Sequence, residues 1–237
     1  MSRRRNHLDA ECWSATVDLT AMLRYLRRRA GARKWRLFVC AVCRRLGPLV
    51  DDAHCQRALR SAELFADGML DQRLRAAACQ RLNALRYDDH RPGDMTQSNF
   101  VLPARWYALQ AVSQSLAFRM PPDGFTGFAA RAVAFSRMES GQPLGWLHFQ
   151  PTLEAETRAQ CDLLRHLAGN PFQATWPLRH CPTTVASLAE ALYHGEDCAF
   201  ALHDALWDAG QARLAQHFAE PDHPKGCWAL DLLLGKE

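Results

Sequence analysis

Three side chains near the end of the chain have types and a spacing that could bind a metal ion. His217, His223 and Cys227 lie beside a proline-containing turn, with five residues between the first two and three between the last two. His180 and Cys181 could supply further ligands from an earlier loop. Imidazole nitrogens and thiolate sulfurs bind Zn²⁺ tetrahedrally. Because the spacing fits no standard zinc finger, we interpret these residues as capping and packing groups. Zinc is the alternative cofactor, and otherwise the sequence calls for none.

Other cysteines and histidines match fragments of known sites. Cys40 and Cys43 have the CxxC spacing of zinc knuckles and redox pairs, but they fall inside a predicted helix, where packing is the favoured role. The HGE sequence at 194–196 matches half of a zinc-deaminase signature, and no PCxxC follows it. Cys227 and His223 could form a nucleophile and base, yet no third residue orients them. We therefore assign no catalytic residue, and the lack of familiar catalytic motifs argues against an enzyme.

Charge is distributed unevenly along the chain. Residues 1–50 carry 12 Lys and Arg against 3 Asp and Glu, a net +9, whereas residues 151–237 carry 6 against 12, a net −6. Arginine suits bidentate phosphate contacts, so a nucleic-acid surface on the first helices is one hypothesis. The residues predicted to form it are Arg24, Arg28, Arg33, Arg36 and Arg44. A solvated face, or pairing with the acidic end, explains the same charge.

Composition places the chain among folded proteins of a reducing compartment. Hydrophobic residues make up 48% of its 237 residues, which is enough for a core. The nine cysteines are odd in number and widely spread, which is typical of free thiols. The basic N-terminus lacks a following apolar segment, and no run is long enough to span a bilayer. The sequence therefore predicts a soluble cytoplasmic protein without a membrane association.

Apolar residues recur with helical spacing through most of the chain. Leu19, Met22, Leu23 and Leu26 share one helix face, and no alternating pattern predicts a strand. The segment 32–46 is apolar on two sides, which favours a central position. Helices are predicted at about 18–30, 32–46, 51–67, from 71 onward, 104–118, 123–138, 153–168, from 183 onward, 197–209 and 211–219. The fold class is therefore all-α, a multi-helix bundle of roughly nine to eleven helices without significant β-sheet.

Two turn-rich stretches, at 88–103 and 140–152, interrupt the periodicity and are predicted to be irregular. They divide the chain into a basic N-terminal helical module, residues 1–90, a helical connector, residues 91–152, and an acidic C-terminal helical module, residues 153–237. The three parts can still pack as one globular unit.

Four segments stand out as recognisable sequence: WRLFVCAVCRRL from Trp35, AELFADG from Ala62, GNPF from Gly169 and HPKGCWALDLLLGKE from His223. They resemble a helical protein family that is frequent in planctomycete bacteria. The resemblance covers the first and last thirds of the chain and implies a shared fold without a known activity. Together these features favour a helical protein-interaction or adaptor module with a protein partner. Nucleic-acid binding and zinc binding are the alternatives.

Overall fold

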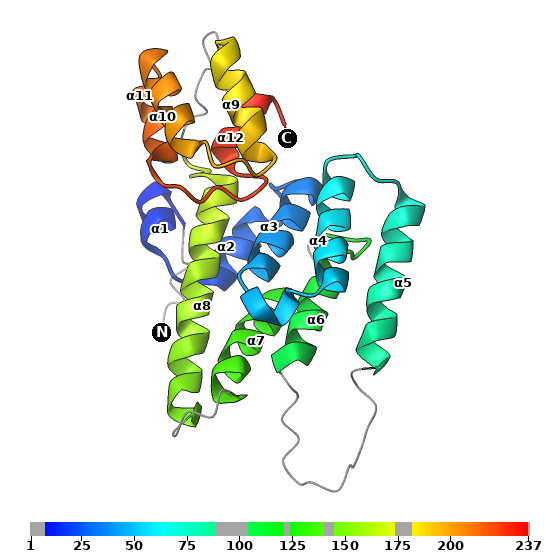
Figure 1. Cartoon of the computed structure of the whole chain (residues 1–237). Helices are drawn as coiled ribbons and strands as arrows, with labels where there is room; N and C mark the ends of the chain where they lie inside the picture. The colour runs from blue at the N-terminus through cyan, green and yellow to red at the C-terminus, as the bar shows by residue number, and fades with distance from the viewer. Residues whose placement is uncertain (1–7, 89–103, 121–123, 140–144, 174–181, 237) are drawn as a thin grey trace, which may run out of the picture. The chain divides into compact units, whose positions relative to one another are not determined.

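A computed structural model describes residues 8–88, 104–120, 124–139, 145–173 and 182–236 (Figure 1). All regular structure in these residues is helical, as the periodicity predicted. The described residues form twelve α-helices, slightly more than the predicted nine to eleven, and two short 3₁₀ helices. The elements are α1 (Ala10–Ala15), α2 (Leu19–Leu26), α3 (Ala32–Arg44), η1 (Gly47–Val50), α4 (Ala53–Ala66), α5 (Gln72–Asp88), α6 (Ala104–Ser115), α7 (Phe125–Glu139), α8 (Gly145–Ala168), α9 (Thr183–Tyr193), α10 (Ala199–Asp208), α11 (Ala212–Ala215), η2 (Gln216–Ala219) and α12 (Trp228–Leu234).

The chain divides into two compact units. We call Met1–Thr16 together with Leu164–Glu237 the terminal unit, and Val17–Leu163 the central unit. The terminal unit therefore includes the last turn of α8, and the rest of that helix belongs to the central unit. Neither limit coincides with the module boundaries predicted at residues 90 and 152.

Helix α3 lies at the centre of the central unit, as its two apolar sides predicted. Nine consecutive residues, from Trp35 to Cys43, are buried. Helices α4, α6 and α7 all pack against it, and α5 packs on the far side of α4 (Figure 1). Phe38 contacts Phe125 of α7 edge to face, with 5.5 Å between the ring centroids. Helix α4 therefore lies between α3 and α5.

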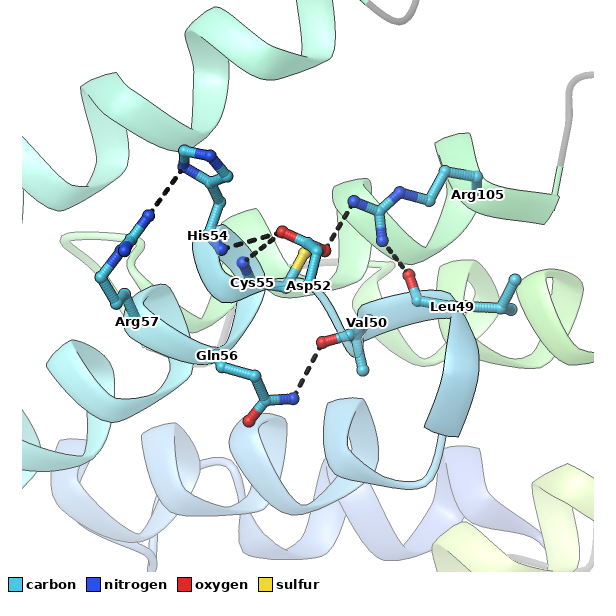
Figure 2. A network of polar contacts seen from close by, with 8 residues as sticks. All are labelled: Leu49, Val50, Asp52, His54, Cys55, Gln56, Arg57 and Arg105. Carbon is cyan, nitrogen blue, oxygen red and sulfur yellow. Dashed lines mark hydrogen bonds and ion pairs between the residues drawn. The ribbon is translucent and has the colours of Figure 1, made fainter.

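Aspartates begin two helices of the central unit where the sequence predicted. The Asp18 carboxylate accepts a hydrogen bond from the Ala21 N–H at 2.9 Å. Asp52 likewise accepts from the N–H groups of His54 and Cys55 at the start of α4 (Figure 2). On its other side, Asp52 forms an ion pair with Arg105 of α6 at 2.7 Å. One carboxylate thus caps α4 and ties it to α6.

The prediction of an irregular stretch at 140–152 is wrong for residues 145–152, because these residues form the first turns of α8. Pro151 lies inside this helix. It removes one backbone donor, but tertiary contacts outweigh that cost. Phe149 packs on Phe135 of α7 with centroids 5.0 Å apart, and Thr152 is buried. No helix of the described residues has both the length and the apolar character needed to cross a membrane.

The terminal unit contains α9 to α12 and the short helix α1, which the sequence analysis did not predict. Apolar residues of α9, α10, η2 and α12 share one core. Trp13 of α1 is buried, and its indole N–H donates to the Gly169 carbonyl at 2.9 Å. Arg165 donates in turn to the carbonyls of Trp13 and Thr16, which lie at the end of α1. These contacts fix the N-terminal helix beside the last turn of α8.

Candidate metal centre

Three histidines and one cysteine meet in the terminal unit. His166 comes from the last turn of α8, His217 from η2, His223 from the following loop, and Cys227 directly precedes α12. One potential ligand atom from each lies within 4.8 Å of all the others. The three histidines are half-buried and Cys227 is fully buried. Among the residues that the structure describes, no other set of three or more such side chains comes together in this way.

A tight turn places His223 and Cys227 together. The Cys227 N–H donates to the Pro224 carbonyl at 3.0 Å, which closes the turn. Gly226 has a φ of +83°, a conformation that glycine adopts without steric cost. The chain then enters α12, and its first turn begins with Trp228. The HPKGC sequence is therefore a compact loop that presents two ligands.

The His223 ring is oriented by the backbone. Its Nε2 lies 2.7 Å from the Glu220 carbonyl oxygen, so Nε2 carries the proton and donates it there. This tautomer leaves the Nδ1 lone pair exposed to the cluster, where Nδ1 lies 3.8 Å from Cys227 Sγ. Metal-bound histidines are commonly held by such a hydrogen bond from the opposite ring nitrogen.

His217 is the innermost histidine of the cluster. Its Nε2 lies 3.0 Å from Cys227 Sγ. The ring centroids of His217 lie 4.9 Å from those of His166 and 5.0 Å from those of His223, at tilted angles. Trp228 packs against the same imidazole at 5.1 Å. Aromatic packing therefore holds the rings close together without stacking them face to face.

Electrostatics favours neutral imidazoles in this cluster. Burial lowers the pKa of His217 to about 3, and the neighbouring His166 and His223 lower it further in the same direction. Burial is also the main reason that the pKa of His223 is lowered. A neutral imidazole offers a free lone pair, so these rings are prepared to bind a cation.

The donor set and its spacing fit a tetrahedral zinc ion. Zinc bonds of 2.0–2.1 Å to nitrogen and 2.3 Å to sulfur place neighbouring ligand atoms about 3.3–3.6 Å apart. The two Sγ to nitrogen distances of 3.0 and 3.8 Å bracket that range. The largest separation, within 4.8 Å, closes by roughly an ångström of side-chain movement. Three imidazoles and one thiolate would complete the coordination of zinc.

The structure brings together three of the four predicted metal ligands, His217, His223 and Cys227. Cys181 lies outside the described residues. His166 was not predicted, because it lies far upstream in the sequence and reaches the site through the fold alone. Its only local signal is its place at the end of a helix, just before the Gly169 turn. As a nucleophile, Cys227 would be poorly placed, since it is 0% exposed.

The remaining cysteine and histidine motifs lie elsewhere. Cys40 and Cys43 are buried in the core of the central unit. Burial raises the pKa of both thiols well above the ordinary value, so they are held as inert, protonated groups. His194 directly follows α9, is exposed, and contacts Glu190 one turn earlier at 3.0 Å. This position agrees with a helix C-terminus rather than a ligand set.

The arginines predicted to bind nucleic acid do not share one free surface. Arg36 is buried, and it donates to the Ser115 carbonyl at the end of α6 at 2.6 Å. Arg33 pairs with Asp67 at 3.0 Å, and Arg44 pairs with Glu63 at 2.7 Å. Arg24 and Arg28 are exposed. Three of the five thus hold the central unit together, and the hypothesis itself stays a prediction.

Searches against protein-family models, curated proteins and solved structures returned no match to this chain. The function must therefore be argued from the geometry of its own residues.

Proposed function

We propose that this chain is a zinc-binding protein whose terminal unit is stabilised by a structural zinc centre. His166, His217, His223 and Cys227 would be the four ligands. One observation carries the proposal: potential ligand atoms from four separate elements lie within 4.8 Å of one another. Zinc would therefore join the end of α8, η2, the HPKGC loop and the start of α12.

A structural centre fits better than a catalytic one. Structural zinc sites use four protein ligands, whereas catalytic sites keep one position open for water or substrate. Here four protein ligands are present, and the cysteine is buried. Zinc also suits the mixture of donors, because thiolate and imidazole together favour zinc or copper over magnesium, calcium or manganese. In the reducing cytoplasm predicted from the sequence, Cys227 would remain a free thiol, which loses its proton when the metal binds.

Metal analysis of untagged protein tests the proposal. We expect about one equivalent of zinc per chain, copurified and retained on gel filtration. Cys227→Ser and His166→Asn should each reduce the bound zinc severely. Cys198→Ser and His194→Asn are matched controls in the same unit. The Cys198 thiol donates to the Leu188 carbonyl instead, and His194 is exposed, so both variants should keep the full equivalent.

Cobalt substitution identifies the donors. Co²⁺ in a tetrahedral site with one thiolate has visible d–d bands and a sulfur-to-metal charge-transfer band. We expect the charge-transfer band in the parent protein and its loss in Cys227→Ser. Protein that contains no zinc or copper, and that binds no Co²⁺ after reduction, would contradict the proposal. Retention of copper alone would correct the identity of the metal while leaving the ligands as assigned.

The role of the zinc-stabilised protein in the cell is a separate question. The sequence prediction of an interaction module for a protein partner remains our proposal for the chain as a whole. It is supported by the helical fold and by the uneven charge distribution. A structural metal is compatible with that role, because it stabilises a surface without taking part in chemistry.

A further inference from the structure

The central unit carries an open groove between α4 and α5 that has no part in the metal centre. Its volume is about 640 Å³. Along α4 it is lined from His54 to Leu64, and along α5 from Ala78 to Ala84. With a rise of 1.5 Å per residue, the α4 side is about 15 Å long. The groove is therefore long enough for roughly ten residues of a helix.

The floor of the groove is apolar. It is formed by Ala58 and Leu64 of α4 and by Ala78 and Leu82 of α5. The two alanines allow a backbone to approach closely, whereas the two leucines provide apolar contact area. Such a floor favours the apolar face of an amphipathic helix.

The rim of the groove is cationic. Arg57, Arg60 and Arg81 line it and are exposed, and no carboxylate is among its lining residues. His54 lies at the N-terminal end of α4, and its Nδ1 is 3.2 Å from a terminal nitrogen of Arg57 (Figure 2). In that view, Arg57 and His54 lie on the side of α4 away from the Asp52 to Arg105 ion pair. A ligand that carries negative charge would complement this rim.

These rim arginines differ from three paired arginines of the central unit. Arg33, Arg44 and Arg45 each pair with a carboxylate of the same unit. Within the described part of the chain, neither Arg57, Arg60 nor Arg81 forms an ion pair. Their charge is therefore available for an external partner.

We propose that the α4–α5 groove binds an amphipathic helix of a partner protein, with acidic residues flanking its apolar stripe. Three observations support this proposal: the length of the groove, its apolar floor and its arginine rim. Single-stranded nucleic acid fits less well, because its bases stack on aromatic side chains and no Phe, Tyr or Trp lines this groove. The inference does not depend on zinc binding in the terminal unit.

Fluorescence anisotropy with a defined probe tests the proposal on the full chain as purified. The probe is a labelled peptide of about 15 residues, with leucines at i, i+3, i+4 and i+7 and glutamates beside them. A second peptide carries lysine in place of every glutamate. We expect the acidic peptide to bind at least tenfold more tightly than the lysine peptide, an order-of-magnitude estimate for charge complementarity.

Two groove variants separate charge from apolar contact. Arg57→Glu with Arg81→Glu should weaken binding of the acidic peptide at least about tenfold and strengthen binding of the lysine peptide. Ala78→Gln keeps the net charge and inserts a polar group into the floor, so it should weaken the acidic peptide several-fold. The matched control is Arg24→Glu with Arg28→Glu, which makes the same charge change at two exposed residues, one in α2 and one just after it. It should leave the affinity for the acidic peptide within about twofold of the parent value.

Equal affinity of the groove and control variants would overturn the proposal, since binding would then follow net charge alone. Equal affinity for the acidic and lysine peptides would overturn it as well. A single-stranded oligonucleotide that displaces the acidic peptide, and whose binding is lost in Arg57→Glu with Arg81→Glu, would assign the groove to nucleic acid instead. Circular dichroism of each variant verifies that the helices are intact.

Discussion

The two units accommodate their buried polar groups in opposite ways. In the central unit, two buried arginines and the buried carboxylate of Glu156 have partners within the same unit. Arg36 and Arg75 donate to the carbonyls of Ser115 and Leu116 at the end of α6, and Arg45 forms two hydrogen bonds with Glu156. In the terminal unit, three imidazoles and a thiol face one another, and burial together with the neighbouring histidines lowers the pKa of His217 and of His223.

This difference separates a unit whose buried arginines already have protein acceptors from a unit whose clustered side chains gain from a ligand. The carbonyls at the end of α6 carry the negative end of the helix dipole, and the arginines neutralise it. The histidines and Cys227 are all potential donors of electron pairs to a cation. The central unit should therefore fold without metal, whereas the terminal unit should depend on it.

Removal of zinc should give the largest effect and should be confined to the terminal unit. Zinc contributes on the order of 10 kcal/mol to the folding of small zinc-dependent units. After chelation, we expect hydrogen exchange to accelerate strongly in α9, α10 and α12, while α3 and α4 keep their protection. Exchange measured by mass spectrometry, with and without chelator, resolves the two units.

The same experiment on Cys198→Ser should reproduce the behaviour of the parent protein, and Cys227→Ser should resemble the chelated protein without treatment. Uniform loss of protection in both units after chelation would contradict the contrast between them. Unchanged protection everywhere would show that the terminal unit is stable without metal.

Replacement of Arg36 by methionine should give the next largest effect, now in the central unit. Methionine fills much of the volume but leaves the Ser115 carbonyl without its donor. Burial lowers the pKa of Arg36 to about 10, and the charge of Arg75 acts in the same direction, so the guanidinium remains charged at neutral pH. We expect the free energy of unfolding to fall by about 2–3 kcal/mol in urea denaturation.

Arg28→Met is the control, because Arg28 is exposed and its replacement should change stability by no more than about 0.5 kcal/mol. The zinc content of both variants should equal that of the parent. If Arg36→Met were as stable as Arg28→Met, the buried hydrogen bonds of Arg36 would not stabilise the central unit.

Local features of the fold could be predicted from the sequence, whereas the contacts that define the sites could not. The helix starts near residues 18 and 51 could be predicted because capping depends on the next few residues only. The central position of α3 followed from apolar residues on two sides. His166 and Arg36 were missed or misplaced because their partners are distant in the sequence. From the sequence alone, Arg36 is predicted to be a surface charge, because nothing local indicates that the end of α6 packs beside it.

Gly169 provides a smaller test of the terminal unit. It has a φ of +64°, and a β-carbon at this position would lie 3.1 Å from Cγ of Trp228. Its carbonyl also accepts the Trp13 N–H. Gly169→Ala should therefore lower the free energy of unfolding by about 1–2 kcal/mol through backbone strain and crowding. A lower melting temperature of the metal-loaded protein would measure this loss.

Gly127 of α7 offers the opposite outcome in the central unit. Its φ is not in the left-handed region, and a β-carbon there would meet only the end of the flexible Arg131 side chain, at 3.2 Å. Gly127→Ala should stabilise the helix by about 0.5–1 kcal/mol. Equal effects of the two substitutions would mean that conformation at Gly169 is not restrictive.

Asp52→Asn should give an effect of similarly small size, and its pH dependence makes it informative. Burial alone would raise the pKa of Asp52, but hydrogen bonds from Arg105 and from the N–H groups of Cys55 and His54 outweigh it and hold the pKa well below its usual range. A carboxylate with a depressed pKa stabilises the folded state above the unfolded pKa of about 3.9, and this contribution is lost as the pH falls below that value.

Asparagine can still cap α4, so the substitution removes mainly the charge that faces Arg105. Because the pair is one-third exposed, we expect a loss of only about 1 kcal/mol at pH 7. That difference should stay constant down to about pH 5 and shrink below pH 4. Hydrogen exchange of α3 and α4 amides measures it for the central unit alone, even where acid releases metal from the terminal unit. A difference that grew on acidification would show that the Asp52 charge opposes folding, and the ion pair with Arg105 would then not stabilise the junction of α4 and α6.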